Sequence, residues 1–277
     1  MKIGCIIQAR TSSTRLPNKV LLTLPEKGST NVLTHVINRV KKSQKITEII
    51  IATTIKQCDG AIEDIAQENE VSCFRGSEKN VLERYYLAAK ASNLDYIVRI
   101  TSDCPCIDAQ IIDKLIAYHF NEKNDYTSNT SAERSFPHGL DAEIFSFELL
   151  EQAYQNANQE YEKEHVTPYI YDTIRESIKI GVLKHDNNLQ DIRVTLDTMD
   201  DYLLLSAVFD YFKDNLEFDL TDLAILFAHK PWLYKINEQI IQKRYFASKD
   251  EELDYAYKLL QNQDLTNAAQ IIKGELS

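Results

Sequence analysis

Three cations lie close together near the start of this chain, at a spacing suited to binding phosphate. Arg10, Arg15 and Lys19 are set among small and hydroxylated residues, and no acidic residue occurs between Met1 and Pro25. The whole chain nevertheless carries a formal net charge of −11. A local cluster of cations stabilises a bound anion even in an acidic protein. The stretch therefore predicts an anion site, and a solvated basic loop is the alternative.

A nucleoside triphosphate suits this chemistry, because nucleotidyl transfer requires phosphate charge to be neutralised by Lys or Arg together with a divalent metal. We predict that the three cations contact the triphosphate and that Arg10 and Lys19 act in catalysis. Ser12 and Ser13 would add neutral hydrogen bonds. A glycine-built phosphate loop is not expected, since the chain has seven glycines and lacks the Gly-x-x-x-x-Gly-Lys-Ser/Thr and Gly-x-Gly-x-x-Gly patterns.

Two aspartates are candidate ligands for that metal. Asp103 directly follows the β-rich run 96–100, and Asp197 ends a second apolar run. Carboxylate oxygens are the ligands that Mg²⁺ prefers, so we predict that Asp103 binds magnesium and is catalytic, with Asp197 as a candidate second ligand. The alternative for Asp103 is a loop carboxylate that caps the next turn. Asp200 and Asp201 are interpreted as residues at a helix N-terminus.

The elements that must position these groups alternate between strand and helix. Four strand–helix repeats predict a parallel sheet with helices on both faces, and ligands of such sheets bind at the carboxyl ends of the strands. The cationic loop, Thr53-Thr54, Gly76-Ser77 and Asp103 each lie at or just after the end of a predicted strand, so we expect them at one edge, with Thr53 among the nucleotide contacts. The predicted strands are 3–7, 49–53, 71–74 and 96–100, and the helices are 32–40, 61–66, 81–91 and 108–116.

The pattern changes after residue 125. The chain is expected to form an α/β three-layer fold with a mostly parallel central sheet, a domain over residues 1–215 and a helical C-terminal extension over 216–277. The later strands are predicted at 126–128, 140–146, 178–183 and 192–196. The later helices are predicted at 147–154, at 160–177 with Pro168 disturbing it, after the cap Thr198, and as a pair at 250–261 and 264–273.

The segment from Gln8 to Lys19, Gln-Ala-Arg-Thr-Ser-Ser-Thr-Arg-Leu-Pro-Asn-Lys, resembles the nucleotide loop of the CTP-dependent cytidylyltransferases. These include the enzymes that activate acidic sugars such as KDO and sialic acid, and the SpsF-like branch of spore-coat polysaccharide synthesis is the most similar. The resemblance covers roughly residues 1–202. It implies a Rossmann-like nucleotidyltransferase fold and Mg²⁺-dependent transfer of CMP from CTP, with release of pyrophosphate. The acceptor would be a small anion, namely an acidic sugar, a sugar or polyol phosphate or a phosphonate, in surface polysaccharide or glycoconjugate synthesis.

The same resemblance implies that Asp197 is the partner of Asp103 in the magnesium site, and it implies further contacts. Nucleotide contacts would come from Ala9 in the loop, from Gly76 and Ser77, and from Arg99 and Thr101 before the metal aspartate. Arg99 stands where the sugar-activating relatives often carry a smaller polar residue.

The stretch from Pro137 to Glu143 resembles the acceptor-side motif. It implies that His138, Asp141 and Glu143 bind substrate, and an edge strand with a solvated acidic face is the alternative. Arg193 would orient an anionic acceptor. Two further residues have alternatives: Arg84 is a ligand or the polar face of its helix, with the helix face slightly favoured, and His165 is functional or packs a helix.

Composition limits the competing functions. The acidic balance argues against nucleic-acid and anionic-membrane partners, and an odd count of five cysteines favours reduced thiols in the cytoplasm. Cys104 and Cys106 lack the second pair that a zinc site needs. A glycosyltransferase usually shows Asp-x-Asp after a strand, whereas this chain has Ser102-Asp103-Cys104. A non-catalytic scaffold would not need both metal aspartates. The C-terminal helices are an appendage or the contact of a possible homodimer.

Overall fold

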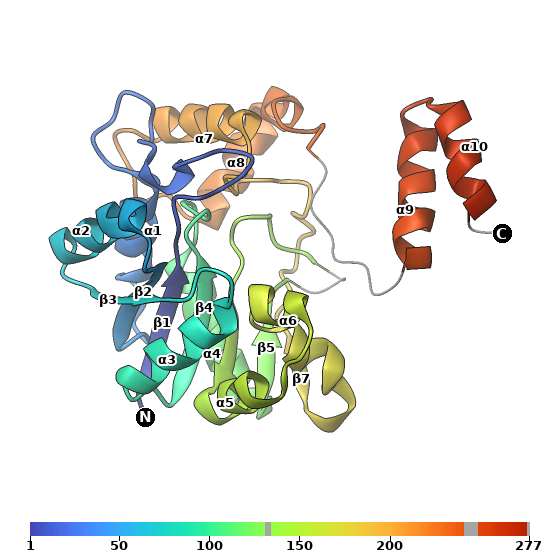
Figure 1. Ribbon diagram of the computed structural model, residues 1–277. Helices are drawn as coiled ribbons and strands as arrows, with labels where there is room; N and C mark the ends of the chain where they lie inside the picture. The colour runs from blue at the N-terminus through green and yellow to red at the C-terminus, as the bar shows by residue number, and fades with distance from the viewer. Residues whose placement is uncertain (131–133, 241–248, 276–277) are drawn as a thin grey trace. The chain divides into compact units, whose positions relative to one another are not determined.

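The computed structural model describes residues 1–130, 134–240 and 249–275. Strand and helix alternate through the first 122 residues, as the sequence predicts (Figure 1). Residues 3–7 of β1 are apolar without interruption because helices cover both faces of the sheet. Side-chain caps start the helices: Asn31 accepts from the Thr34 N–H, and Asp108 accepts from the Gln110 N–H. The elements are β1 Ile3–Gln8, α1 Val32–Val40, β2 Glu48–Thr54, α2 Gly60–Glu68, β3 Ser72–Gly76, α3 Val81–Ala91, β4 Tyr96–Thr101 and α4 Ala109–Glu122.

A seven-stranded sheet is the centre of the first part of the chain. Its order is β3-β2-β1-β4-β6-β5-β7, with β6 running antiparallel to both of its neighbours and the other adjacent pairs parallel. The first four strands therefore end at one edge, as expected, and the predicted α/β fold with a mostly parallel sheet is confirmed. The three remaining strands are β5 Tyr126–Ser128, β6 Glu143–Ser146 and β7 Ile180–Val182.

Two apolar clusters fill the space between the sheet and its helices. One joins β1, β2 and β4 to α1, α2 and α4, with Val36, Ile62 and Ile112 among its members. The other joins the opposite face of the same strands to α3 and α5 Phe147–Asn156. Odd and even strand residues divide between them, so that Ile7 enters the first cluster and Ile6 the second.

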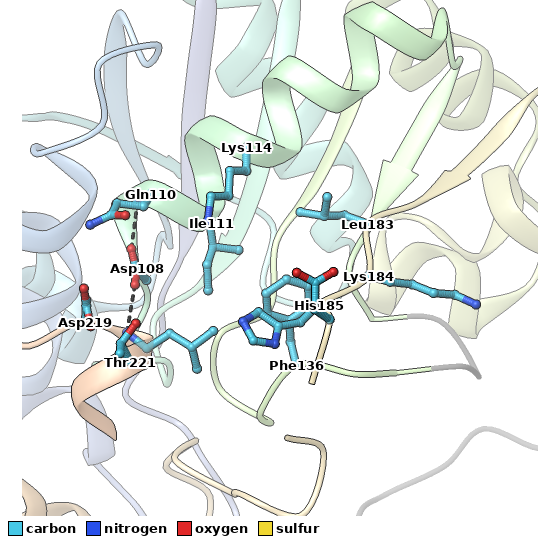
Figure 2. A pocket seen from close by; sticks show the side chains of 12 residues that line it. Asp108, Gln110, Ile111, Lys114, Phe136, Leu183, Lys184, His185, Asp219 and Thr221 are labelled. Carbon is cyan, nitrogen blue, oxygen red and sulfur yellow. Dashed lines mark hydrogen bonds between the residues drawn. The ribbon is translucent and has the colours of Figure 1, made fainter. Parts of the chain in front are cut away.

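A third apolar cluster covers the carboxyl edge of the sheet. It contains α7 Met199–Tyr211 and α8 Leu220–His229, together with Leu16 and Leu24 from the loop after β1. Figure 1 shows α7 and this loop at the same end of the sheet. Asp108 ties α8 to α4, because its carboxylate accepts from the Leu220 N–H as well as from Gln110 (Figure 2). Leu16 and Leu24 of the loop therefore pack in the same apolar cluster as α7 and α8.

Two expected elements differ in the structure. Residues 192–196 are extended but form no strand; a single bridge joins Arg193 to His138, and the Leu196 N–H donates to the carbonyl of Asp103. The helix expected over 160–177 is not continuous: α6 Glu160–His165 ends before Pro168, the predicted point of disturbance, and short helical turns follow at Tyr169–Thr173 and Arg175–Ser177. Val166 follows at a φ of 73°, and the Thr167 N–H bonds the carbonyl of His165, which turns the chain before Pro168.

The chain divides into two compact units, Met1–Gln239 and Ile240–Ser277. The boundary expected after residue 215 lies inside the first unit, because Phe218, Leu220 and Phe227 belong to its third apolar cluster. The second unit contains α9 Lys249–Asn262 and α10 Thr266–Glu275, close to the predicted helical pair. No helix in the described ranges has the length and apolar character needed to cross a membrane.

Candidate nucleotide and metal site

The cationic loop after β1 is folded tightly back on itself. Thr11 donates from its N–H and its hydroxyl to one oxygen of Asp59, at 2.8 and 2.6 Å, and Thr54 donates to the other. Asp59 is fully buried. Burial alone would raise its pKa, but these hydrogen bonds hold the pKa below its usual value. The Asn18 N–H bonds the carbonyl of Thr11, so the loop closes before the short turn that begins at Lys19.

Lys19 lies between the two predicted metal ligands. Its ammonium nitrogen is 2.7 Å from Asp103 Oδ2 and 2.9 Å from Asp197 Oδ1, and it also donates to the carbonyl of Leu196 at 2.8 Å. Burial alone would lower the pKa of Lys19, but the two carboxylates raise the pKa above its ordinary value. Thr101, at the end of β4, donates to Asp103 Oδ1 at 2.5 Å. Asp103 and Asp197, which are 84 and 178 positions from Lys19 in the sequence, thus meet at its ammonium group.

Asp197 receives two further cations. Arg15 Nη2 is 3.1 Å and Arg193 Nη2 is 3.2 Å from Asp197 Oδ2. The structure therefore brings Arg15, Lys19, Asp103 and Asp197 together, four of the residues that sequence reasoning assigned to the triphosphate and the metal.

The donor set fits a magnesium ion whose coordination is completed by substrate. Asp103 and Asp197 present hard oxygen ligands that already flank a positive charge. In the described part of the chain, no group of three or more His, Cys, Asp or Glu side chains could hold a metal ion. Mg²⁺ is commonly bound by one or two carboxylates plus phosphates and water rather than by an all-protein cage. Two carboxylates beside a cationic loop match that preference.

The ends of β2 and β3 form the neighbouring part of the edge. The Ser12 hydroxyl donates to Glu78 at 3.2 Å, and Lys56 pairs with the same carboxylate at 2.6 Å. Lys56 and, to a smaller extent, the exposed Arg10 hold the pKa of Glu78 below its ordinary value. Sequence reasoning missed Glu78, although it directly follows the predicted nucleotide residue Ser77.

Other predicted nucleotide residues differ in exposure. Ser13 is half-buried, whereas Ala9 and Thr53 are buried. The hydroxyl of Thr53 has no hydrogen-bond partner among the described residues. Contacts of these three with a nucleotide stay predictions.

Arg84 is not the polar face of its helix. Its side chain is 1% exposed and donates from Nη1 to the carbonyl of Ser77 at 2.7 Å. Gly76 packs beside it, since a Cβ at Gly76 would lie 3.3 Å from Arg84 Cγ. The buried guanidinium therefore supports the Gly76-Ser77 loop from below, and burial lowers its pKa. The solvated alternative favoured by the sequence pattern is wrong.

Arg99 and Glu143 bind each other rather than facing solvent. They are register partners on β4 and β6, and Arg99 Nη1 lies 2.9 Å from Glu143 Oε2. Tyr126 and Thr167 also donate to the Glu143 carboxylate. Glu143 is 6% exposed, so the alternative of a solvated acidic face is wrong for this residue. Contacts of the pair with nucleotide and substrate stay predictions.

We predict that breaking this pair destabilises the protein strongly. Arg99→Met leaves the buried Glu143 carboxylate without its cation and is expected to lower the free energy of unfolding by about 3 kcal/mol. Adding Glu143→Gln should recover part of the loss, because the uncompensated charge is then removed. Urea unfolding at pH 7 measures both values. Lys235→Met, which breaks the exposed pair with Glu238, is the control and should change stability by less than about 0.5 kcal/mol. If Arg99→Met lowered the free energy of unfolding by no more than Lys235→Met does, the prediction would be contradicted.

The predicted acceptor residues lie in one stretch against the extended segment 192–196. His138 exchanges backbone hydrogen bonds with Ile192 and Val194. Burial, with Arg134 and Arg193 nearby, lowers the pKa of His138 to about 4, so the imidazole is neutral at pH 7. Asp141 pairs with Arg134 at 2.5 Å. His138 is therefore next to Arg193, Asp141 is paired with Arg134, and Glu143 is buried with Arg99.

Gly139 allows this stretch to approach the segment that carries Asp197. Its φ is +101°, and a Cβ would lie 2.5 Å from the Val194 carbonyl carbon and 2.6 Å from the Thr195 nitrogen. We predict that Gly139→Ala lowers the free energy of unfolding by more than about 2 kcal/mol, from strain and displaced backbone. The matched control is Gly60→Ala at the start of α2, where nothing lies within 4 Å. Thermal and urea unfolding of both variants check it; equal stabilities would contradict it.

The fold matches that of solved nucleotidyltransferases. The structure of CMP:2-keto-3-deoxy-manno-octonic acid synthetase complexed with CTP matches with a TM-score of 0.56 at 14% identity, covering 76% of this chain and 99% of that one, which shows the fold. A family model described as Cytidylyltransferase matches residues 4–271. The chain belongs to the cytidylyltransferase family.

Three relatives are similar over most of their length. The chain is 41% identical to the uncharacterised protein MJ1063 of Methanocaldococcus jannaschii, covering 88% of this chain and 98% of that protein. It is 32% identical to the spore coat polysaccharide biosynthesis protein SpsF of Bacillus subtilis, covering 82% and 94%. A solved cytidylyltransferase from Leptospira borgpetersenii is 36% identical with a TM-score of 0.79, covering 88% and 100%. The predicted resemblance to the SpsF-like cytidylyltransferases is confirmed.

Proposed function

We propose that this cytidylyltransferase-family protein transfers CMP from CTP to a small anionic acceptor in surface polysaccharide or glycoconjugate synthesis. An oxygen of the acceptor attacks the α-phosphorus of CTP. The new bond joins that oxygen to the α-phosphorus, the bond to the bridging oxygen of the β-phosphate breaks, and pyrophosphate leaves with the bonding electron pair. The acceptor's own anionic oxygen is the nucleophile, so no strong protein base is assigned.

One observation carries this proposal: Lys19 of the cationic loop lies within 3 Å of both Asp103 and Asp197. Lys19 and Arg15 of the cationic loop meet Asp103 and Asp197, which are distant in the sequence, at the carboxyl edge of the sheet. Catalysis there rests on alignment and on stabilising negative charge. Arg10, Arg15 and Lys19 would hold the phosphate oxygens, and Asp103 and Asp197 would hold Mg²⁺. That ion supplies charge neutralisation on the phosphates when bound.

The acceptor would lie next to Asp197, against the stretch 138–141. His138 and Asp141 are its proposed contacts. Arg193 is already bonded to two carboxylates, Asp197 and Asp201, so its proposed contact with the acceptor is secondary. An acidic sugar, a sugar or polyol phosphate or a phosphonate would each present the required anionic oxygen. The polysaccharide role of the relative SpsF supports a sugar-type acceptor.

Two further features of the protein belong to the proposal. All five cysteines are free, which supports the expected reducing, cytoplasmic location. A homodimer is proposed from the helical C-terminal extension, and light scattering tests it: a mass of 31.9 kDa at every concentration would contradict the dimer.

The test of function begins with nucleotide binding. Thermal unfolding is measured with CTP, UTP, GTP and ATP, each with and without Mg²⁺, because a ligand of the native state raises the melting temperature. We expect the largest shift with CTP plus Mg²⁺, and then pyrophosphate release when anionic acceptors are added. A shift with UDP-sugars or GDP-sugars and none with CTP would favour a glycosyltransferase. No shift with any nucleotide would contradict the proposal and favour a scaffold.

A further inference from the structure

We infer that Asp201, Arg193 and Asn237 form a buried network that positions Asp197, and that Asn237 is a positioning residue of the site. The inference rests on the proposed function, because Asp197 is a proposed metal ligand there. Asn237 follows α8 and the turn Pro231–Lys235, and none of the motifs in the sequence analysis includes it.

Asp201 makes far more bonds than a helix cap requires. Its side chain is fully buried. Oδ2 accepts from the N–H groups of Asp197 and Thr198 at 2.9 and 3.1 Å, from the Thr198 hydroxyl at 3.2 Å and from Arg193 Nη2 at 3.0 Å. Oδ1 accepts from Arg193 Nε at 2.9 Å. Capping of α7 uses only the reciprocal bonds with Thr198, so the bonds to Arg193 and Asp197 serve another purpose.

The network reaches both the backbone and the carboxylate of Asp197. The backbone N–H of Asp197 is bound directly by Asp201. The carboxylate is bound by Arg193 Nη2 at 3.2 Å, and the same guanidinium is held by Asp201 through two nitrogens. Asp201 also balances the charge of Arg193. Asp201 therefore fixes the orientation of the Asp197 carboxylate indirectly, through Arg193 and through the Asp197 backbone.

Asn237 completes the network from a distant part of the chain. Its side chain is 5% exposed. Its amide nitrogen donates to Asp201 Oδ1 at 2.9 Å and to the backbone carbonyl of Arg193 at 3.2 Å. The side-chain amide of Asn237 thus uses both of its donors, one to hold Asp201 and the other to hold Arg193. Leucine at this position would fill the same space without either donor, and aspartate would set a second carboxylate against Asp201.

Partners of this kind matter for metal binding because they orient the ligand. Mutating an outer-shell partner of a metal site typically costs 10- to 100-fold in metal affinity or activity. A network that only stabilises the fold would instead lower the melting temperature and leave metal affinity unchanged. The two roles are therefore separable by measuring metal binding well below the melting temperature.

The test compares Asn237→Leu with wild type and with Asn156→Leu, a control that removes one exposed amide bonded only to its own helix. Mn²⁺ binding is titrated at 25 °C by electron paramagnetic resonance of free Mn²⁺, in the presence of CTP and without acceptor. We expect Asn237→Leu to raise the Mn²⁺ dissociation constant about tenfold or more, to leave CTP binding without metal within twofold, and to recover activity at high Mg²⁺. Asn156→Leu should match wild type.

Asn237→Gln, which retains an amide, serves as the conservative variant and should recover part of the Mn²⁺ affinity. If a folded Asn237→Leu variant bound Mn²⁺ as tightly as wild type, this inference would be overturned but the proposed function would not. This holds even if the variant melts at a lower temperature. Failure of wild-type protein to bind CTP and Mn²⁺ together would overturn the proposed function and this inference with it.

Discussion

Asp197→Asn is expected to reduce CMP transfer by about 10²- to 10³-fold, the size seen when one group that stabilises transition-state charge is removed. The variant keeps the shape of the side chain but loses the charge that would hold the metal. Arg15, Lys19 and Arg193 all lie within hydrogen-bonding distance of this carboxylate, so the variant also leaves three cations less well balanced. Pyrophosphate release at saturating CTP and Mg²⁺ measures the effect.

Asp200→Asn is the matched control for this experiment. Asp200 is exposed in the first turn of α7 and undergoes the same chemical change three residues away. Its turnover should stay within twofold of wild type. If Asp197→Asn also stayed within twofold, the two-aspartate metal site would be wrong, and the family fold would have to use another arrangement in this chain.

Lys19→Ala is expected to have two separable effects. Loss of a charge-assisted hydrogen bond to phosphate should weaken CTP binding by roughly 10- to 100-fold. In protein without metal or nucleotide, the variant also removes the cation between Asp103 and Asp197, and Asp103 loses its ion pair while Arg15 and Arg193 still pair with Asp197. The free energy of unfolding should then fall by about 2 kcal/mol, less than for a fully buried pair because both carboxylates are partly exposed.

Calorimetric titration with CTP and urea unfolding in chelator measure these two effects. Lys27→Ala, an exposed lysine of the same segment, is the control and should change neither. CTP affinity that is equal in the two variants would remove Lys19 from the proposed phosphate site. Added Mg²⁺ should restore stability to Lys19→Ala, since a divalent cation can then take the position between the carboxylates.

Local patterns in the sequence determined the frame of this protein. Continuous apolar runs such as Ile3–Ile7 and side-chain caps such as Asn31 and Asp108 depend on neighbours a few residues away, so the strands and helices of the first half were predictable. Parallel topology then placed the loop after β1 and Asp103 at one edge. The loop itself, from Gln8 to Lys19, was specific enough to indicate the family.

The tertiary structure alone decided which charged groups are paired. Arg99 meets Glu143 because β6 inserts antiparallel beside β4, and a strand pattern does not reveal its partner or register. Arg84 was expected on a polar helix face, but the Gly76-Ser77 loop covers it and supplies a carbonyl.

Asn237 had no local signal at all, since its partners Asp201 and Arg193 lie 36 and 44 residues away. The sequence does not reveal whether an arginine or a carboxylate side chain faces water, substrate or an oppositely charged side chain. Burial and long-range packing determine their partners, because an ion pair forms where the fold removes both groups from water together.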